Sequence, residues 1–209
     1  MSRADRLDGL AHDPPVAAGM RWPPRGTVDA MHARIVLGHG ASGTAAGMRP
    51  WVDGLRDLGL DARAIDLPRG RAERAVPVFL AAISGDAGVA PGGHSFGGRV
   101  ASLAVARAFE LGDRGAAGLV LLSYPLHPPG RPDRWADRTA HWPALTLPVL
   151  LLSGESDPFA RLPLLREAVA RLPDARLVTY PRVGHGLLPV LADALPEIDA
   201  FIRSLDVRR

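Results

Sequence analysis

One short segment of the chain holds residues whose types and spacing could do chemistry. Residues 92–98 read Gly-Gly-His-Ser-Phe-Gly-Gly and contain the pattern Gly-x-Ser-x-Gly centred on Ser95. Small residues on both sides of a serine allow a sharp turn between a strand and a helix, which pushes the hydroxyl outward. The pattern therefore predicts a nucleophile elbow with Ser95 as the nucleophile.

Two later loops supply the partners that a serine nucleophile requires. Hydrolysis through serine needs a base that removes the hydroxyl proton and a carboxylate that orients the base. Asp157 lies in the run Ser-Gly-Glu-Ser-Asp-Pro-Phe, and His185 lies between two glycines. The order Ser, Asp, His is expected when an elbow serine works on an α/β sheet. We predict that His185 is the base and Asp157 the acid, with Glu155 as the nearest alternative acid.

A second glycine-rich loop, at residues 38–43, follows an apolar run that is typical of a buried strand. Acyl transfer needs backbone N–H donors where negative charge develops on the carbonyl oxygen. We predict that the N–H groups of Ala41 and Phe96 form this oxyanion hole. The loop lacks the Lys-Ser/Thr ending of a phosphate-binding loop, so it predicts no nucleotide site.

The same residues also allow interpretations without chemistry. Ser95 could be a capping serine at a helix N-terminus, Asp157 before Pro158 fits an N-cap, and His185 could be an ordinary loop residue. His39 is expected to shape the oxyanion loop, and His94 to pack under the elbow. The remaining histidines have no partner at metal-ligand spacing, so we expect structural or surface roles and no metal or cofactor; they are His12, His32, His127 and His141.

The elements that must position these residues alternate between strands and helices. Such alternation predicts the α/β class, with a mostly parallel sheet and helices on both faces. Strands are expected at 33–37, 62–67, 88–93, 119–122, 148–152 and 176–180, and helices at 48–58, 73–84, 100–112, 162–172 and 188–205. Pro77 is expected in the first turn of its helix, Pro196 should interrupt the last one, and Pro91 makes its strand the weakest prediction. The chemically loaded loops would meet at the carboxyl edge of the sheet.

Composition limits the classes of protein that fit. A chain of 209 residues with 47% hydrophobic content predicts one domain, which we place at 29–209 after an arm at 1–28. A net charge of +3 without a basic cluster predicts no nucleic-acid partner. The absence of cysteine excludes disulfides, thiolate zinc sites and a cysteine nucleophile. Without an apolar run of membrane-spanning length or a signal-peptide pattern, we expect no membrane partner and a cytoplasmic location.

These motifs together resemble the α/β-hydrolase superfamily over about residues 30–205. Within it, residues 92–99, 124–130 and 154–159 are similar to a small subgroup that includes bacterial dienelactone-hydrolase-like proteins. Eukaryotic relatives also belong to that subgroup, one of them a subunit of a histone-acetyltransferase complex. The resemblance implies the fold and the site geometry. The chain departs from the larger esterases through a reduced core, His-Gly-Ala-Ser at 39–42 where they often have His-Gly-Gly-Gly, and no room for a large cap.

Two functions are therefore expected from the sequence. The first is a serine hydrolase that acts on a small ester, thioester or lactone through an acyl-enzyme, and the alternative is a non-catalytic scaffold of the same fold. Five prolines in residues 125–146 favour a short rim over a helical cap. Basic side chains of this segment could place positive charge at the cleft mouth or belong to a solvated loop; they are Arg131, Arg134, Arg138, His127 and His141.

Overall fold

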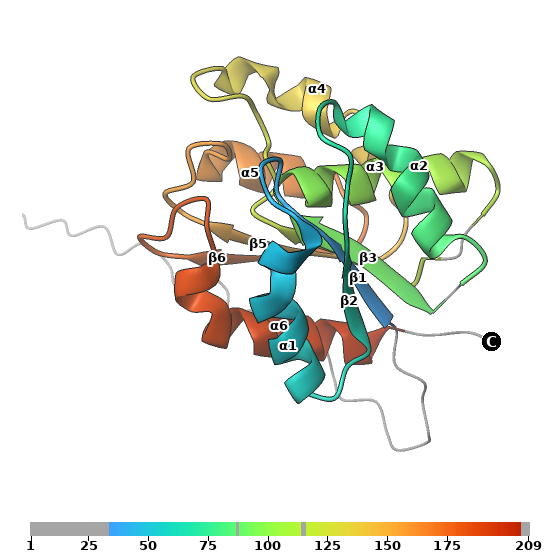
Figure 1. The fold of residues 1–209 in the computed structure, drawn as a ribbon. Helices are drawn as coiled ribbons and strands as arrows, with labels where there is room; N and C mark the ends of the chain where they lie inside the picture. Colours follow the sequence, from blue (N-terminus) through green and yellow to red (C-terminus); the bar gives the residue numbers. More distant parts are fainter. Residues whose placement is uncertain (1–33, 87, 114–115, 206–209) are drawn as a thin grey trace, which may run out of the picture.

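The computed structural model describes residues 34–86, 88–113 and 116–205. The predicted arm at 1–28 lies outside these residues. Six strands form one parallel sheet in the order β2-β1-β3-β4-β5-β6 (Figure 1). Their bounds are Arg34–Gly38 (β1), Ala62–Ile65 (β2), Val89–His94 (β3), Leu119–Leu122 (β4), Val149–Gly154 (β5) and Ala175–Tyr180 (β6). The predicted α/β class is confirmed.

Helices cover both faces of the sheet (Figure 1). One face packs against α1 (Arg49–Asp57) and α6 (Leu191–Ser204), and the other against α2 (Ala72–Ile83), α3 (Phe96–Glu110) and α5 (Leu162–Val169). Side chains of a strand point alternately to the two faces, so Ile35 and Leu37 enter one hydrophobic core while Val36 enters the other. This double burial explains why the inner strands β4 and β5 consist mainly of leucine and valine.

The segment between β4 and β5 forms a low rim rather than a domain. It contains the short helix α4 (Trp135–Thr139) between two 3-10 turns, η2 (Pro132–Arg134) and η3 (Trp142–Ala144). Trp142 is fully buried, and its ring meets that of Tyr124 edge to face at 5.0 Å between centroids. The rim is therefore anchored by an aromatic contact and is too small to enclose the site as a cap would.

Pro91 is tolerated in the central strand β3 because of its position in the ladder. The carbonyl of Val89 accepts a hydrogen bond from Ala117 N–H, and Ser95 N–H donates to the carbonyl of Leu122. The backbone N–H and C=O groups of the odd-numbered residues of this strand thus point toward β4. The continuous ladder between β3 and β4 begins at Gly92. The nitrogen of Pro91, which carries no hydrogen, lies between the isolated bridge Val89–Ala116 and this ladder, where the pairing of the two segments is interrupted.

Two predictions about prolines in helices were wrong. Pro77 lies beyond the first turn of α2, where it cannot donate to the carbonyl of Glu73, and α6 continues through Pro196 without interruption. A proline inside a helix removes one hydrogen bond and disfavours the helix by about 3 kcal/mol. Both helices bury apolar faces, including Phe79 in α2 and Phe201 in α6, and this packing outweighs the local preference.

The turn between β3 and α3 has the strained geometry of a nucleophile elbow. Ser95 has φ 52° and ψ −112°, a backbone conformation that residues other than glycine rarely adopt. Helix α3 begins at the next residue. A Cβ at Gly97 would lie 2.2 Å from the carbonyl atoms of Gly38 in β1. Only glycine at this position allows the start of α3 to pass so close to the sheet.

This close approach yields a stability prediction. Gly97→Ala should lower the free energy of unfolding by at least about 2 kcal/mol, because the new methyl group meets backbone that cannot move aside. Gly47→Ala is the matched control, since nothing lies within 4 Å of a Cβ built there, and it should change stability by less than about 0.5 kcal/mol. Urea denaturation of both variants measures the difference, and equal stabilities would contradict this account of the elbow.

Candidate active site

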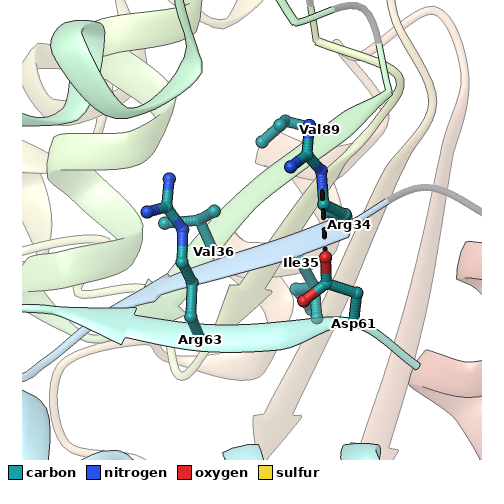
Figure 2. A pocket seen from close by; sticks show the side chains of 6 residues that line it. All are labelled: Arg34, Ile35, Val36, Asp61, Arg63 and Val89. Atoms are coloured by element: carbon teal, nitrogen blue, oxygen red, sulfur yellow. Dashed lines mark ion pairs between the residues drawn. The ribbon is translucent and has the colours of Figure 1, made fainter. Parts of the chain in front are cut away.

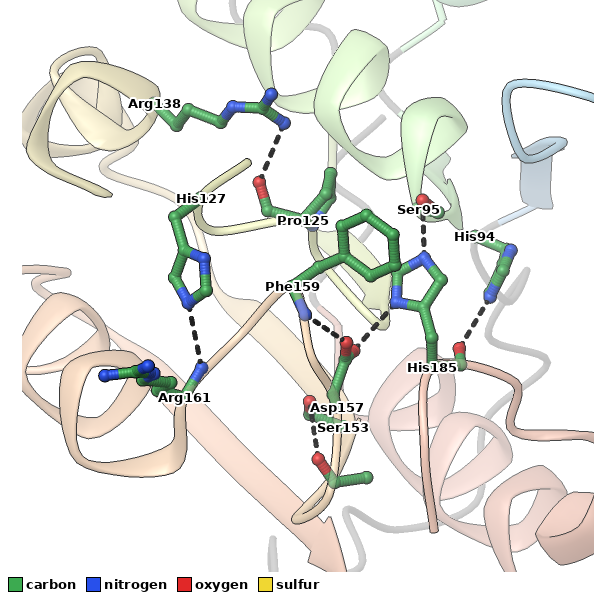
Figure 3. A network of polar contacts seen from close by, with 11 residues as sticks. His94, Ser95, Pro125, His127, Arg138, Ser153, Asp157, Phe159, Arg161 and His185 are labelled. Atoms are coloured by element: carbon green, nitrogen blue, oxygen red, sulfur yellow. Dashed lines mark hydrogen bonds and ion pairs between the residues drawn. The ribbon is translucent and has the colours of Figure 1, made fainter. Parts of the chain in front are cut away.

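Three side chains from three different loops form one hydrogen-bonded chain at the carboxyl edge of the sheet (Figure 3). Ser95 follows β3, Asp157 follows β5 and His185 follows β6. The Oγ of Ser95 lies 2.8 Å from Nε2 of His185, and Nδ1 of His185 lies 2.8 Å from Oδ2 of Asp157. The carboxylate accepts from Nδ1–H, which leaves Nε2 free to accept the serine proton.

The environment of the two carboxylates separates Asp157 from its alternative. Asp157 is buried, and its Oδ1 accepts the backbone N–H of Phe159 at 2.8 Å. Its Oδ2 accepts from His185, so hydrogen bonds hold both oxygens of the carboxylate. Glu155 instead accepts the hydroxyl of Thr179 at 2.9 Å. The structure therefore brings Asp157 to His185 and directs Glu155 elsewhere. Asp157 also does not cap α5, whose N-cap is Arg161.

His94, immediately before the serine, holds the His185 loop in place. Its Nε2–H donates to the backbone carbonyl of His185 at 3.0 Å (Figure 3). Burial lowers the pKa of His94, which keeps its ring neutral at pH 7. On the other side, the ring of Phe159 lies 4.4 Å from that of His185 between centroids. His185 is thus held between two rings, a role for His94 that the sequence pattern alone did not indicate.

His39 fixes the loop that follows β1. Its ring is 3% exposed, Nδ1–H donates to the carbonyl of Gly40 at 2.7 Å, and Nε2 accepts the N–H of Leu67 at 3.0 Å. Both ring nitrogens are used, so the ring ties the loop to the segment after β2. This geometry agrees with the expected role of His39 in shaping the loop that carries Ala41.

Ser95 opens into a pocket of about 370 Å³. Ala41 and Phe96, the residues predicted to form the oxyanion hole, line the same pocket. The other lining residues come from the start of α2, from α3, from the rim and from the loop after β5; they are Gly70, Arg71, Ala72, Glu73, Arg99, Pro125, Pro129, Arg138 and Phe159. Arg71 and Arg99 were missed from the sequence, although Arg99 stands one helical turn beyond Ser95 and could have been found by that spacing.

The rim residues proposed to carry positive charge have different roles in the structure. His127 is buried, with Nδ1–H donating to the carbonyl of Pro128 at 3.0 Å and Nε2 accepting Arg161 N–H at 3.2 Å. The expected structural role of His127 therefore agrees with its contacts, whereas its proposed place at the cleft mouth does not.

Two rim arginines are paired with acids outside the pocket. Arg131 contacts Asp133, and Arg134 contacts Asp137. Of the basic rim residues, only Arg138 lines the pocket beside Ser95. His12 and His32 lie outside the described residues.

A second, smaller cavity lies at the opposite edge of the sheet (Figure 2). It has about 150 Å³ and is lined at the amino ends of the strands by Arg34, Ile35, Val36, Asp61, Arg63 and Val89. Nε of Arg34 lies 3.9 Å from Oδ2 of Asp61. Because no serine or histidine lines it, this cavity offers neither a nucleophile nor a base, and the pocket at Ser95 is the better candidate site.

The described residues contain neither a metal-binding cluster nor a membrane-spanning helix. No three His, Asp or Glu side chains among them gather closely enough to hold a metal ion. None of the helices within residues 34–86, 88–113 and 116–205 has the length and apolar character needed to cross a membrane.

The strained elbow, the parallel sheet and the order of the three side chains together define an α/β hydrolase. The chain matches the alpha/beta hydrolase domain family over residues 71–193, more than half of its length, and it belongs to that family. No curated protein sequence is significantly similar to it.

Solved structures share the fold at low identity. A predicted CIB-like hydrolase from Thermoplasma acidophilum superposes with a TM-score of 0.69 at 18% identity, covering 86% of this chain and 90% of the other. The carboxylesterase EstE1 from a metagenomic library gives 0.68 at 17%, covering 86% and 82%. The monoacylglycerol lipase of Paleococcus ferrophilus gives 0.67 at 17%, covering 81% and 93%. Each resemblance lies in the fold.

One contact beneath the pocket predicts a pH dependence of stability. Nε2–H of His141 donates to Oγ of Ser102 at 2.8 Å, and that hydroxyl donates to the carbonyl of Arg99. Burial, aided by the charge of Arg99, lowers the pKa of His141 to about 4. The unfolded chain takes up this proton near pH 6.5, whereas the folded chain does so only near pH 4.

Folding stability should therefore fall as the pH drops from about 7 to about 4.5, by about 2 kcal/mol from His141 alone. His141→Gln keeps an N–H donor but cannot titrate, so its loss of stability over this range should be smaller by that amount. Urea denaturation at the two pH values measures it. Identical pH dependence in the two proteins would show that His141 protonates as easily in the folded state as in the unfolded state.

Proposed function

We propose that this protein is a serine hydrolase that cleaves a small ester, thioester or lactone through an acyl-enzyme. The observation that carries the proposal is the continuous hydrogen-bonded chain from Ser95 through His185 to Asp157. That arrangement has the nucleophile, the base and the orienting carboxylate at hydrogen-bond distance, as this chemistry requires.

In the first half of the proposed reaction, Oγ of Ser95 attacks the carbonyl carbon while its proton passes to Nε2 of His185. Asp157 stabilises the imidazolium through Nδ1–H. The N–H groups of Ala41 and Phe96 would bind the oxyanion of the tetrahedral intermediate. The bond from carbon to the leaving oxygen or sulfur then breaks, and His185 gives its proton to the leaving group.

In the second half, water replaces the leaving group. His185 takes a proton from the water, the resulting hydroxide attacks the acyl carbon, and the bond to Ser95 breaks as the serine oxygen regains that proton. The acid product leaves and the enzyme returns to its starting state. The two halves together need only the three side chains, two backbone donors and one water molecule.

The structural neighbours support ester chemistry in general terms. Two of them are a carboxylesterase and a monoacylglycerol lipase. Because each is only 17% identical to this chain, the substrate has to be inferred from the residues of this chain itself. We further propose that the chain belongs with the dienelactone-hydrolase-like subgroup, on the motifs at 92–99, 124–130 and 154–159.

A non-catalytic scaffold of the same fold is the alternative. A scaffold has no need of a strained serine, yet Ser95 is held at φ 52° with its hydroxyl directed to a histidine. Such strain persists only where the surrounding structure enforces it, and it concentrates at active sites. This observation favours the enzyme.

A covalent probe tests the nucleophile. A fluorophosphonate should label the native protein on Ser95, and Ser95→Ala should abolish the labelling because no other serine is activated by His185. Mass spectrometry of the labelled peptide locates the adduct. Labelling that survives the substitution would favour the scaffold. A panel of activated esters, thioesters and lactones completes the test, and turnover equal to the Ser95→Ala background on every compound would also favour the scaffold.

The two carboxylates after β5 provide a matched pair for testing the acid. Asp157→Asn should lower kcat on an activated ester by at least about a hundredfold with little change in KM, because the imidazole would be held in the wrong tautomer. Glu155→Gln, which alters a contact with Thr179, should change kcat by less than about threefold. Steady-state kinetics of both variants decides, and the opposite ranking would assign the acid to Glu155.

A further inference from the structure

The pocket at Ser95 is unevenly charged. Three arginines line it, Arg71, Arg99 and Arg138, and Glu73 is the one acidic residue among its lining side chains. The remaining wall is largely apolar and includes Pro125 and Phe159. Positive charge gathered against apolar walls is less screened than charge on an open surface, so it acts strongly on a ligand in the pocket.

Arg99 is the charge nearest to the nucleophile along the chain. Its backbone N–H donates to the carbonyl of Ser95, so it stands one helical turn beyond the serine on α3. One amino group of its guanidinium donates to Glu73 at 2.8 Å, while its buried Nε has no hydrogen-bond partner among the described residues. The protein therefore leaves part of the donor capacity of Arg99 unused.

Arg138 reaches the same pocket from α4 in the rim. Its Nη1 donates to the backbone carbonyl of Pro125 at 3.1 Å (Figure 3), so this guanidinium contacts a neutral acceptor there. Burial lowers the pKa of Arg138, and the nearby positive charge of Arg99 lowers it further. The two guanidinium groups thus repel each other across the pocket, and an anion bound there would relieve the repulsion.

The contrast with the rest of the rim shows that this arrangement is particular to the pocket. Arg134 is paired with Asp137 on the exposed side of the rim, as are Arg131 and Asp133. Neither pair lines the pocket. In the pocket, by comparison, a backbone hydrogen bond lowers the pKa of Glu73, and the charges of Arg99 and Arg71 lower it further, so this one carboxylate faces more than one arginine.

We propose that the arginine-lined pocket is a subsite for an anionic group, and that the substrate is an ester whose short acyl part carries a carboxylate. This inference rests on the proposed serine hydrolase for its reaction, but the anion subsite itself can be tested by binding alone. A carboxylate can accept two hydrogen bonds from a guanidinium, which makes it a good match for Arg99 and Arg138.

The position of the pocket assigns the charge to the acyl part. The pocket begins at Ser95 and at the two predicted oxyanion residues, Ala41 and Phe96, and extends to α2, α3 and the rim. His185, which must deliver a proton to the leaving alcohol, is not among its lining residues. We therefore assign the acyl chain to this pocket and the leaving group to the side of Ser95 that faces His185.

Three esters of similar size distinguish the alternatives. Monoethyl succinate carries a carboxylate on its acyl part, 3-(butyryloxy)propanoate carries one on its alcohol part, and ethyl butyrate is neutral. The kcat/KM of the native protein should be at least about tenfold higher for monoethyl succinate than for ethyl butyrate, and this ratio should fall as salt is added. A ratio near one would overturn the proposal, and a preference for the propanoate ester would overturn the acyl assignment.

Variants test the named residues. Arg99→Gln and Arg138→Gln should each lower the ratio of kcat/KM for monoethyl succinate to that for ethyl butyrate by about tenfold or more. Glu73→Gln should raise it, because Arg99 loses its competing partner, and a gain of this kind cannot come from a folding defect. Arg134→Gln is the matched control, because Arg134 belongs to the same rim but is paired with Asp137 outside the pocket. This substitution should leave the ratio unchanged. A ratio that is unchanged in both pocket variants would overturn the subsite.

Binding separates this inference from the proposed function. Ser95→Ala should bind monoethyl succinate more tightly than ethyl butyrate in calorimetric titrations, and adding Arg99→Gln should remove the difference. If the native protein hydrolyses none of the esters but this binding difference is found, the hydrolase proposal fails and the anion subsite stands. If ethyl butyrate is hydrolysed but no difference in binding is found, the subsite fails and the hydrolase stands.

Discussion

The approach of α3 to β1 is the contact on which the rest of the site depends. Gly97 lies so close to Gly38 that no side chain fits between the helix and the strand. This contact sets the start of α3 directly after Ser95 and imposes the positive φ of the serine. The same constraint fixes Phe96, the next residue, in the wall of the pocket. The nucleophile, one expected donor and Arg99 are thus positioned by one backbone contact.

His185 is positioned by a different principle, because its ring and its backbone carbonyl are held by side chains of other loops. Contacts from three neighbours hold it: Asp157 through the ring nitrogen, His94 through the backbone carbonyl and Phe159 through the ring face. Asp157 and Phe159 follow β5 and His94 ends β3, so the imidazole keeps its orientation only when both of these strand ends are in place beside its own loop. Folding and the formation of the site are therefore linked.

Much of this arrangement could be predicted from the sequence, because its signals are local. Short apolar runs identified several of the strands, with only a weak signal at 88–93, and glycines around Ser95 identified the elbow. The continuity of α6 through Pro196 could not be predicted, since tertiary burial overrides a local preference. Contacts between residues far apart in the chain could not be predicted either. They determine the roles of His94 and His127 and the pairing of Arg99 with Glu73.

His127 also connects the rim to the loop that carries the acid. Its N–H donates to the carbonyl of Phe159, and its ring accepts the N–H of Arg161, so two hydrogen bonds bracket the turn after Asp157. A rim fastened in this way cannot swing aside as a lid without disturbing the carboxylate. This end of the rim and the turn that carries the acid accordingly form one connected unit, whose geometry is set when the chain folds.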